Sequence, residues 1–171
     1  METWDAIRAR RNVREHADRP IAARDLDRIL EAARRSPSSN NEQPWDFVVL
    51  TDRDRLVKLA GVWRWGGHLA TASAALAFIG AATTDPEQRE TIAFDMGQAT
   101  MSVMLAAADL GIGTCHSAIG DQGLARELLG LPADRECVVL LSLGYPAGRP
   151  LTPVEHPDRR AFDDVVHRDG W

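Results

Sequence analysis

Nine residues, Pro37-Ser38-Ser39-Asn40-Asn41-Glu42-Gln43-Pro44-Trp45, lie between a helical pattern and a strand pattern. The pattern before them predicts a helix, because its apolar residues follow the spacing i, i+3, i+4 and i+7: Leu26, Ile29, Leu30 and Ala33. The run Trp45 to Leu50 predicts a strand. Proline ends helices, and serine and asparagine side chains favour turns. The sequence therefore predicts a helix, a polar loop and a strand in that order.

The polar loop has two interpretations. Its hydroxyl and amide groups both donate and accept hydrogen bonds, as the edge of a heteroaromatic ring such as a flavin requires. The alternative is a capping turn between the helix and the strand. A capping turn accounts for Ser36 and Ser38, but less easily for Asn41 and Gln43 together.

Downstream, Asp85-Pro86 begins a long helical pattern that Gly111 ends. Its apolar period runs through Ile92, Met96, Ala99, Val103, Ala107 and Leu110. At 1.5 Å per residue such a helix is about 35–40 Å long. Further strands are predicted at 74–82, 114–118 and 137–143, and a further helix at 124–129. The pattern is α+β, with helices around a small sheet, and 171 residues suit a single domain over residues 1–171.

Composition and charge exclude several other classes of protein. A net charge of −5 argues against a general nucleic-acid binder. The longest mostly apolar stretch, residues 69–82, is too short to span a bilayer. Residues 1–5 lack the basic and apolar regions of a signal peptide, so we expect a cytoplasmic protein. The two cysteines and five histidines show no metal-ligand spacing, and we expect no metal site.

Arginines form two clusters, one near each end of the chain. The first contains Arg8, Arg10, Arg11 and Arg14, and the second contains Arg159 and Arg160. Each arginine taken alone is explained by a solvated surface charge. Taken together they suit a ligand that carries phosphate, because guanidinium groups bind phosphate oxygens in bidentate pairs.

These segments resemble the motifs of the nitroreductase family. Residues 10–14, Arg-Arg-Asn-Val-Arg, are similar to the family's Arg-Arg-Ser-x-Arg opening. Residues 37–45 match its Pro-Ser-x-x-Asn-x-Gln-Pro-Trp motif at every fixed position. The resemblance continues in family order over essentially the whole chain, through residues 95–99, 110–115, 143–146 and 164–167.

The resemblance implies an α+β, nitroreductase-like fold, with a small mixed sheet surrounded by helices and a long central helix. It implies a domain-entwined homodimer with FMN bound between the subunits and a C-terminal tail, about residues 147–171, that extends over the partner. It also implies an oxidoreductase that takes hydride from NADH or NADPH. The reduced enzyme would then reduce nitroaromatic, quinone or related small acceptors by a ping-pong mechanism, without nucleic-acid or membrane partners.

The same resemblance assigns cofactor-binding residues. Arg10, Asn12 and Arg159 are assigned to bind the phosphate. Arg160 is assigned as a secondary phosphate ligand, and Arg11 belongs to the same cluster as Arg10. Arg14 lies near the N1–O2 side of the flavin and stabilises the anionic reduced form. The loop residues Pro37, Ser38, Ser39 and Asn41 reach the flavin from the partner subunit, and Gln43 contacts the ribityl chain. Backbone N–H groups around Ala118 and Ile119 face N5 and O4, and no side chain is assigned as a general acid.

Two departures from the family pattern bear on these assignments. Asn12 replaces the usual serine, and Ala161-Phe162 replaces the usual Pro-Leu, which leaves the register of Arg159 against Arg160 open. Two rival functions also stay open. One is a flavin-fragmenting, dehydrogenating or dehalogenating enzyme on the same scaffold. The other is a non-enzymatic FMN-binding or flavin-sequestering protein, which would not oxidise NAD(P)H.

Overall fold

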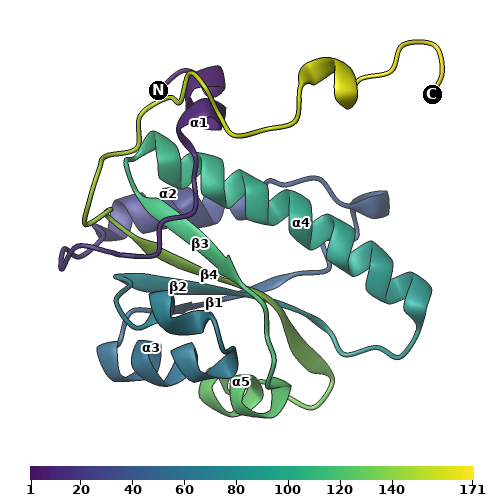
Figure 1. The fold of residues 1–171 in the computed structure, drawn as a ribbon. Helices are drawn as coiled ribbons and strands as arrows, with labels where there is room; N and C mark the ends of the chain where they lie inside the picture. Colours follow the sequence, from purple (N-terminus) through teal and green to yellow (C-terminus); the bar gives the residue numbers. More distant parts are fainter.

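A four-stranded sheet with helices on both faces forms the body of the protein in the computed structural model, which describes residues 1–171 (Figure 1). The strand order is β1-β2-β4-β3, and neighbouring strands all pair antiparallel. The strands are β1 Asp46–Leu50, β2 Ala74–Ala81, β3 Gly113–Ser117 and β4 Arg135–Gly144. Parallel pairing is confined to one isolated bridge, between Asn12 and Thr114. The α+β fold class and the long central helix are confirmed, whereas the sheet is antiparallel where a mixed one was expected.

The chain also contains five α-helices and four short 3-10 turns. The helices are α1 Thr3–Ala9, α2 Ala23–Arg34, α3 Arg53–Leu59, α4 Pro86–Asp109 and α5 Gln122–Leu129. The 3-10 turns are η1 Ser39–Asn41, η2 Ala60–Val62, η3 Gly66–Leu69 and η4 Phe162–Asp164. Three aspartates cap helices by accepting from backbone N–H groups of the first turn: Asp52, Asp85 and Asp121.

The sheet is buried on both faces, so its central strands alternate between two apolar clusters. On one face, Leu76 and Phe78 pack with α2 and α4. On the other, Ala77 and Ile79 pack with α3 and α5. Because β2 is covered on both sides, it is a continuous apolar run rather than an alternating one.

Helix α4 is 24 residues long, about 36 Å at 1.5 Å per residue, and crosses one face of the sheet (Figure 1). Its inner face is buried against the sheet and α2. Phe94 and Met101, seven residues apart, remain 67% and 46% exposed. The helix therefore carries a second apolar stripe that its own chain does not cover.

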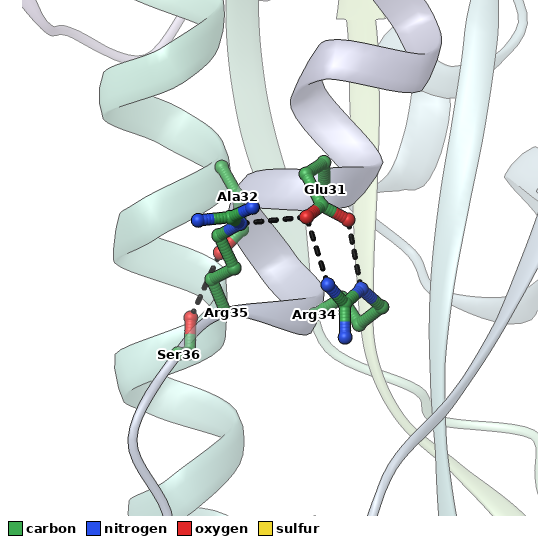
Figure 2. Close-up of polar contacts among 5 residues, drawn as sticks. All are labelled: Glu31, Ala32, Arg34, Arg35 and Ser36. Carbon is green, nitrogen blue, oxygen red and sulfur yellow. Dashed lines mark hydrogen bonds and ion pairs between the residues drawn. The ribbon is translucent and has the colours of Figure 1, made fainter.

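Helix α2 ends in a group of charged residues directly before the polar loop (Figure 2). The Glu31 carboxylate accepts two hydrogen bonds from Arg34, at 2.7 and 2.8 Å, and one from Arg35 at 2.6 Å. These bonds lower the pKa of Glu31 to about 2. The Ser36 hydroxyl donates to the Ala32 carbonyl at 3.2 Å and so binds the last turn of the helix.

The C-terminal segment after β4 leaves the body of the molecule. Residues 152–171 are almost all exposed; in Figure 1 the segment first passes α1, and its yellow end then extends away from the body. Within it Phe162 is 65% exposed and Trp171 is fully exposed. None of the helices combines the length and apolar character needed to cross a membrane.

Candidate functional site

Two glycines of the sheet allow the N-terminal arginine segment to lie directly against the strands. Gly113 and Gly144 face each other across β3 and β4. A Cβ on Gly113 would lie 2.5 Å from a Val13 methyl, and one on Gly144 would lie 2.8 Å from His16 Nδ1. Neither position therefore accommodates a side chain. Residues 12–16 approach the strands closely, and the Val13 N–H donates to the Thr114 carbonyl at 2.9 Å.

Arginines from three segments meet in a cavity of about 430 Å³ between α1 and the C-terminal segment. Its lining includes Arg8, Arg10, Arg11, Arg149 and Arg159. Three arginines of the first cluster, Arg8, Arg10 and Arg11, therefore lie together in space with Arg159 of the second. Arg160 is outside this lining and donates instead to the Asp164 carbonyl at 2.7 Å.

The arginine cavity suits an anion, although its charge is mixed. Burial and the nearby charge of Arg149 lower the pKa of Arg11, whose guanidinium donates to the Arg149 carbonyl at 2.6 Å. Glu155 and Asp158 also line the cavity and offset part of the positive charge. Asn12, the next residue after Arg11, does not line the cavity, and its Oδ1 is buried without a hydrogen-bond partner. An acceptor left free in this way fits a ligand hydroxyl or N–H group.

Arg14 belongs to a second cavity, of about 250 Å³. Ala118, one of the two residues predicted at the flavin N5 edge, lines it too. The rest of the lining is Trp63, Trp65, His68, Cys115, His116 and Ser117. The side chain of Ile119, the other predicted residue, packs against the apolar cluster under α3 and α5.

The polar loop is attached to α4 through Asp95, a fully buried carboxylate. The Ser39 N–H donates to both Asp95 oxygens at 3.1 Å, and the Ser39 hydroxyl donates to Oδ1 at 3.3 Å. Ser38 Oγ accepts from the Gln43 N–H at 2.9 Å. Three residues of the loop have positive φ: Asn40 at 51°, Asn41 at 59° and Gln43 at 52°. This backbone conformation is unusual for residues other than glycine, and it is common at ligand sites.

Within one chain, the polar loop of residues 37–45 and the arginine cavity lie far apart. Ser39 is bound to Asp95, whereas Ala9, next to Arg10, packs on Ala108. Asp95 and Ala108 are thirteen positions apart on α4, which is a distance of about 20 Å along the helix. The exposed Pro37 and Asn41 thus face a different part of the surface from the arginine cavity.

A buried polar chain lies behind the second cavity. His68 Nδ1 and His16 Nε2 both contact Ser142 Oγ, at 2.8 and 3.2 Å. Burial, together with the charges of His16, Arg14 and His116, lowers the pKa of His68 to about 4. Burial also lowers the pKa of His16, which is partly offset by the Gly144 backbone. Both imidazoles are therefore neutral at pH 7.

Sequence reasoning missed Arg149, Asp95 and His68 as parts of the site. The dipeptide Arg149-Pro150 follows the last strand in a polar tail, and nothing local marks it as a cavity residue. Asp95 had a visible signal, since a carboxylate in an otherwise apolar helical period needs a buried partner. His68 lies in a segment of weak periodicity between Gly61 and Ser73.

Comparison with known proteins identifies the family and the fold. The model of the nitroreductase family matches residues 7–65 and 61–145. A relative from Archaeoglobus fulgidus, whose name pairs NADH dehydrogenase with NAD(P)H nitroreductase, is 34% identical over 99% of both chains. The 4-nitrobenzoate reductase of Nocardioides sp. is 26% identical, over 85% of this chain and 81% of its own.

Solved structures share the fold. The FMN-dependent nitroreductase of Clostridium difficile R20291 superposes with a TM-score of 0.84 at 25% identity, over 97% of this chain and 98% of its own. A crystal structure from Clostridium acetobutylicum gives a TM-score of 0.86 at 24% identity, over 98% of this chain and all of its own. The motifs that resemble a family, the matched sequence and the shared fold agree, and the chain belongs to the nitroreductase family.

Proposed function

We propose that this protein is an FMN-dependent oxidoreductase that takes electrons from NADH or NADPH and reduces nitroaromatic, quinone or related small acceptors. The observation that carries the proposal is the arginine cavity, in which Arg10, Arg11 and Arg159 meet. Relatives named as an NAD(P)H nitroreductase and an FMN reductase support the same activity.

The residues of this chain fit FMN in chemical terms. Arginine forks supply the donors that a terminal phosphate accepts. By the family resemblance, the Asn12 side-chain amide would add an N–H donor to the phosphate, and Gln43 would contact the ribityl chain. Arg14, together with the polar wall of the second cavity, would then lie at the ring system.

When bound, FMN would accept a hydride from the nicotinamide and, after that product leaves, supply it to the acceptor in the same cleft. The protein's part is to bind, orient and polarise. Arg14 provides preorganised positive charge where negative charge develops. The loop from Pro37 to Gln43 would reach the cofactor of the other subunit in a homodimer, and the tail of about residues 147–171 would cover that subunit. Each chain would remain a single domain over residues 1–171.

The test compares the binding of FMN with the binding of riboflavin, the flavin that lacks the phosphate. Protein saturated with FMN and then desalted should keep the flavin absorbance. Arg10→Ala should weaken FMN binding by about 10- to 100-fold, since a hydrogen bond to a charged group is worth about 1.5–3 kcal/mol.

Riboflavin, which lacks the phosphate, is the matched control, and its affinity should not change in Arg10→Ala. Loss of all flavin on desalting would contradict the proposal, as would a preference for FAD. Flavin retention without any oxidation of NADH or NADPH would favour a flavin-sequestering protein instead.

A further inference from the structure

The cavity that Arg14 and Ala118 line differs in charge from the other cavities of the protein. Four others, of about 250 to 430 Å³, each include at least one carboxylate in their lining. The lining of the Arg14 cavity includes none, although the chain as a whole has a net charge of −5. Arg14 itself takes part in none of the ion pairs of the chain. The cavity therefore presents positive charge that no carboxylate of its lining offsets, and this favours an anionic ligand.

A large aromatic side chain lines the same cavity and remains open to solvent. Trp65 contributes to the lining, yet 71% of the residue is exposed. An indole in this position offers a face to a planar ring, and offset stacking of two rings is favourable. Pockets for small molecules are typically lined by such aromatic groups together with a few polar ones. The cavity therefore combines a wall for a flat ring with positive charge.

The turn that carries Trp65 is fixed to the body of the protein. The Gly66 N–H donates to the Trp63 carbonyl at 2.8 Å and closes the turn around Trp65. The Val62 carbonyl accepts from the Gly120 N–H at 2.9 Å. A Cβ on Gly120 would lie 2.6 Å from the Trp63 ring, so this ring packs directly on that backbone. The backbone of the aromatic wall is therefore ordered before any ligand binds, which lowers the entropy cost of binding.

Strand β3 contributes a free polar side chain to the cavity. Its residues Cys115 and Ser117 are buried, whereas His116 between them is exposed. The Ser117 hydroxyl already donates to the Ala118 carbonyl at 3.0 Å. The contact from Cys115 Sγ reaches the backbone carbonyl of His116 and leaves the imidazole free. An imidazole N–H without a partner in the protein suits an acceptor oxygen of a ligand, such as one of a carboxylate.

We propose that the Arg14 cavity binds planar aromatic acceptors that carry a carboxylate and prefers them to neutral ones. This inference rests on the proposed function and narrows its class of acceptors. The acceptor ring stacks on Trp65, the carboxylate accepts a hydrogen bond from His116, and the charge of Arg14 favours the anion. A volume of about 250 Å³ suits a molecule with one ring rather than a nicotinamide dinucleotide, because pockets for drug-sized ligands are about 300–1,000 Å³. Ala118, predicted at the flavin N5 edge, lines the same cavity, so the acceptor would lie beside the cofactor.

The kinetic test compares 4-nitrobenzoate with 4-nitrobenzamide, which has the same ring and nitro group but no charge. In both, a hydride that originates from NADH and a proton from solvent convert the nitro group into a nitroso group, and water leaves. With FMN-loaded enzyme the KM for 4-nitrobenzoate should be about three- to fivefold lower, the upper range for an exposed ion pair. The difference should shrink in about 1 M salt, where the Debye length is about 3 Å. Equal KM values for the two acceptors would overturn the proposal.

Variants separate the ring contact from the charge contact. Trp65→Ala should raise both KM values by about two- to tenfold, the contribution of an aromatic pair, and Trp65→Phe should stay close to the wild type. His116→Ala should raise the KM for 4-nitrobenzoate alone, and His116→Gln should recover part of the loss because its amide still donates. Val57→Ala, which shortens an exposed side chain on α3 outside the cavity, is the control and should change neither KM. The proposal is wrong if Trp65→Ala changes neither KM, if His116→Ala changes both equally, or if His116→Ala instead abolishes a preference for NADPH over NADH.

Binding without turnover separates the acceptor site from the proposed function. Oxidised, FMN-loaded protein is titrated with benzoate or benzamide, which carry no nitro group, and the flavin absorbance reports the dissociation constants. Benzoate should bind about three- to fivefold more tightly, and His116→Ala should remove the difference. Equal binding would overturn the acceptor site, and reduction of 4-nitrobenzamide by the same protein with NADH would leave the proposed function intact. Selective binding of benzoate in a protein that oxidises neither NADH nor NADPH would contradict the proposed function instead.

Discussion

Arg14 is the charged side chain on which the proposed chemistry depends most at the scale of single residues. It is exposed, and it lines the cavity that Ala118 also lines. Arg14→Ala should slow flavin reduction more than it weakens FMN binding, because the charge favours the reduced anion. The expected loss is about 1.5–3 kcal/mol of stabilisation. Anaerobic stopped-flow reduction and the midpoint potential measure it.

Arg64→Ala is the control for Arg14, since Arg64 lies over the faces of Trp63 and Trp65 beside the same cavity but does not line it. It should leave the reduction rate and the midpoint potential unchanged. A normal potential and normal kinetics in Arg14→Ala would show that Arg14 is only a surface charge.

His68 makes folding stability depend on pH. Its folded pKa is about 4, below the ordinary value of 6.5, so the unfolded chain binds more protons between those values. Stability is therefore fully present above pH 6.5 and falls as the pH drops toward 4. Between pH 7 and pH 5 this site alone should cost about 2 kcal/mol.

Urea unfolding at the two pH values measures this loss, and His68→Gln should show a correspondingly smaller one. The glutamine does not titrate, so the comparison uses the difference in stability between the two pH values within each protein. An identical loss in His68→Gln would mean that His68 titrates normally in the folded protein.

At the scale of elements, the attachment of the polar loop to α4 depends on one carboxylate. Asp95→Ala leaves the Ser39 N–H without its buried acceptor, which should cost about 1–3 kcal/mol of stability. It should also weaken FMN binding, because Ser38, Ser39 and Asn41 would lose their fixed positions. Chemical unfolding and flavin titration measure both effects.

Asp95→Asn is the matched variant, because its amide oxygen still accepts from Ser39 while the charge is lost. We expect it to recover most of the stability and of the FMN affinity. If Asp95→Asn were as damaging as Asp95→Ala, the negative charge rather than the hydrogen bond would support the loop.

Local patterns predicted most of the elements but few of the contacts between them. The periods of α2 and α4 were visible because burial of one helix face imposes a repeat of 3.6, and β4 was visible as a nearly continuous apolar run. The 3-10 turns η2 and η3 were not, since tertiary packing of Val62 and Leu69 decides their conformation. The Ser39–Asp95 bond joins residues 56 apart, and no local pattern encodes such a pairing.

In the candidate site, too, the sequence predicted some residues and missed others. The family motifs identified Arg10, Arg11 and Arg159, which the fold brings to one cavity. They did not indicate Arg149, or the way His68 approaches Ser142 across 74 residues of sequence. The sequence alone could not show that Arg160 lies outside the cavity, because neighbouring side chains in an extended segment point in different directions.

At the scale of the whole molecule, the uncovered apolar surface points to the proposed homodimer. Phe94 and Met101 on α4 are exposed, as are Trp4 on α1 and Phe162 and Trp171 in the tail. A monomer rarely leaves so many large apolar side chains in water, and a symmetric interface would cover them. The separation of about 20 Å along α4 between the loop and the arginines has the same explanation if each flavin is shared.

Mixed dimers test the shared site. Arg10→Glu and Asn41→Asp should each abolish activity alone, since one loses a phosphate contact and the other a contact from the partner. Heterodimers of the two should regain up to about half the activity per dimer, because one of the two sites is then intact. Subunit exchange followed by NADH oxidation measures this recovery.

Two controls accompany this experiment. Mixing either variant with itself should restore nothing. Dimers that exchange subunits without regaining activity would contradict the shared site, and an active, flavin-loaded monomer in sedimentation would contradict the dimer.

The burial of the two cysteines affects how the protein resists oxidation. Cys115 lies at the cavity of Arg14, and burial raises its pKa; burial raises that of Cys137 to about 12. Hydrogen peroxide, which redox enzymes meet in air, attacks the thiolate rather than the thiol. Both sulfurs are therefore protected from sulfenic acid formation, and the protein should survive many turnovers under oxygen without a thiol reductant.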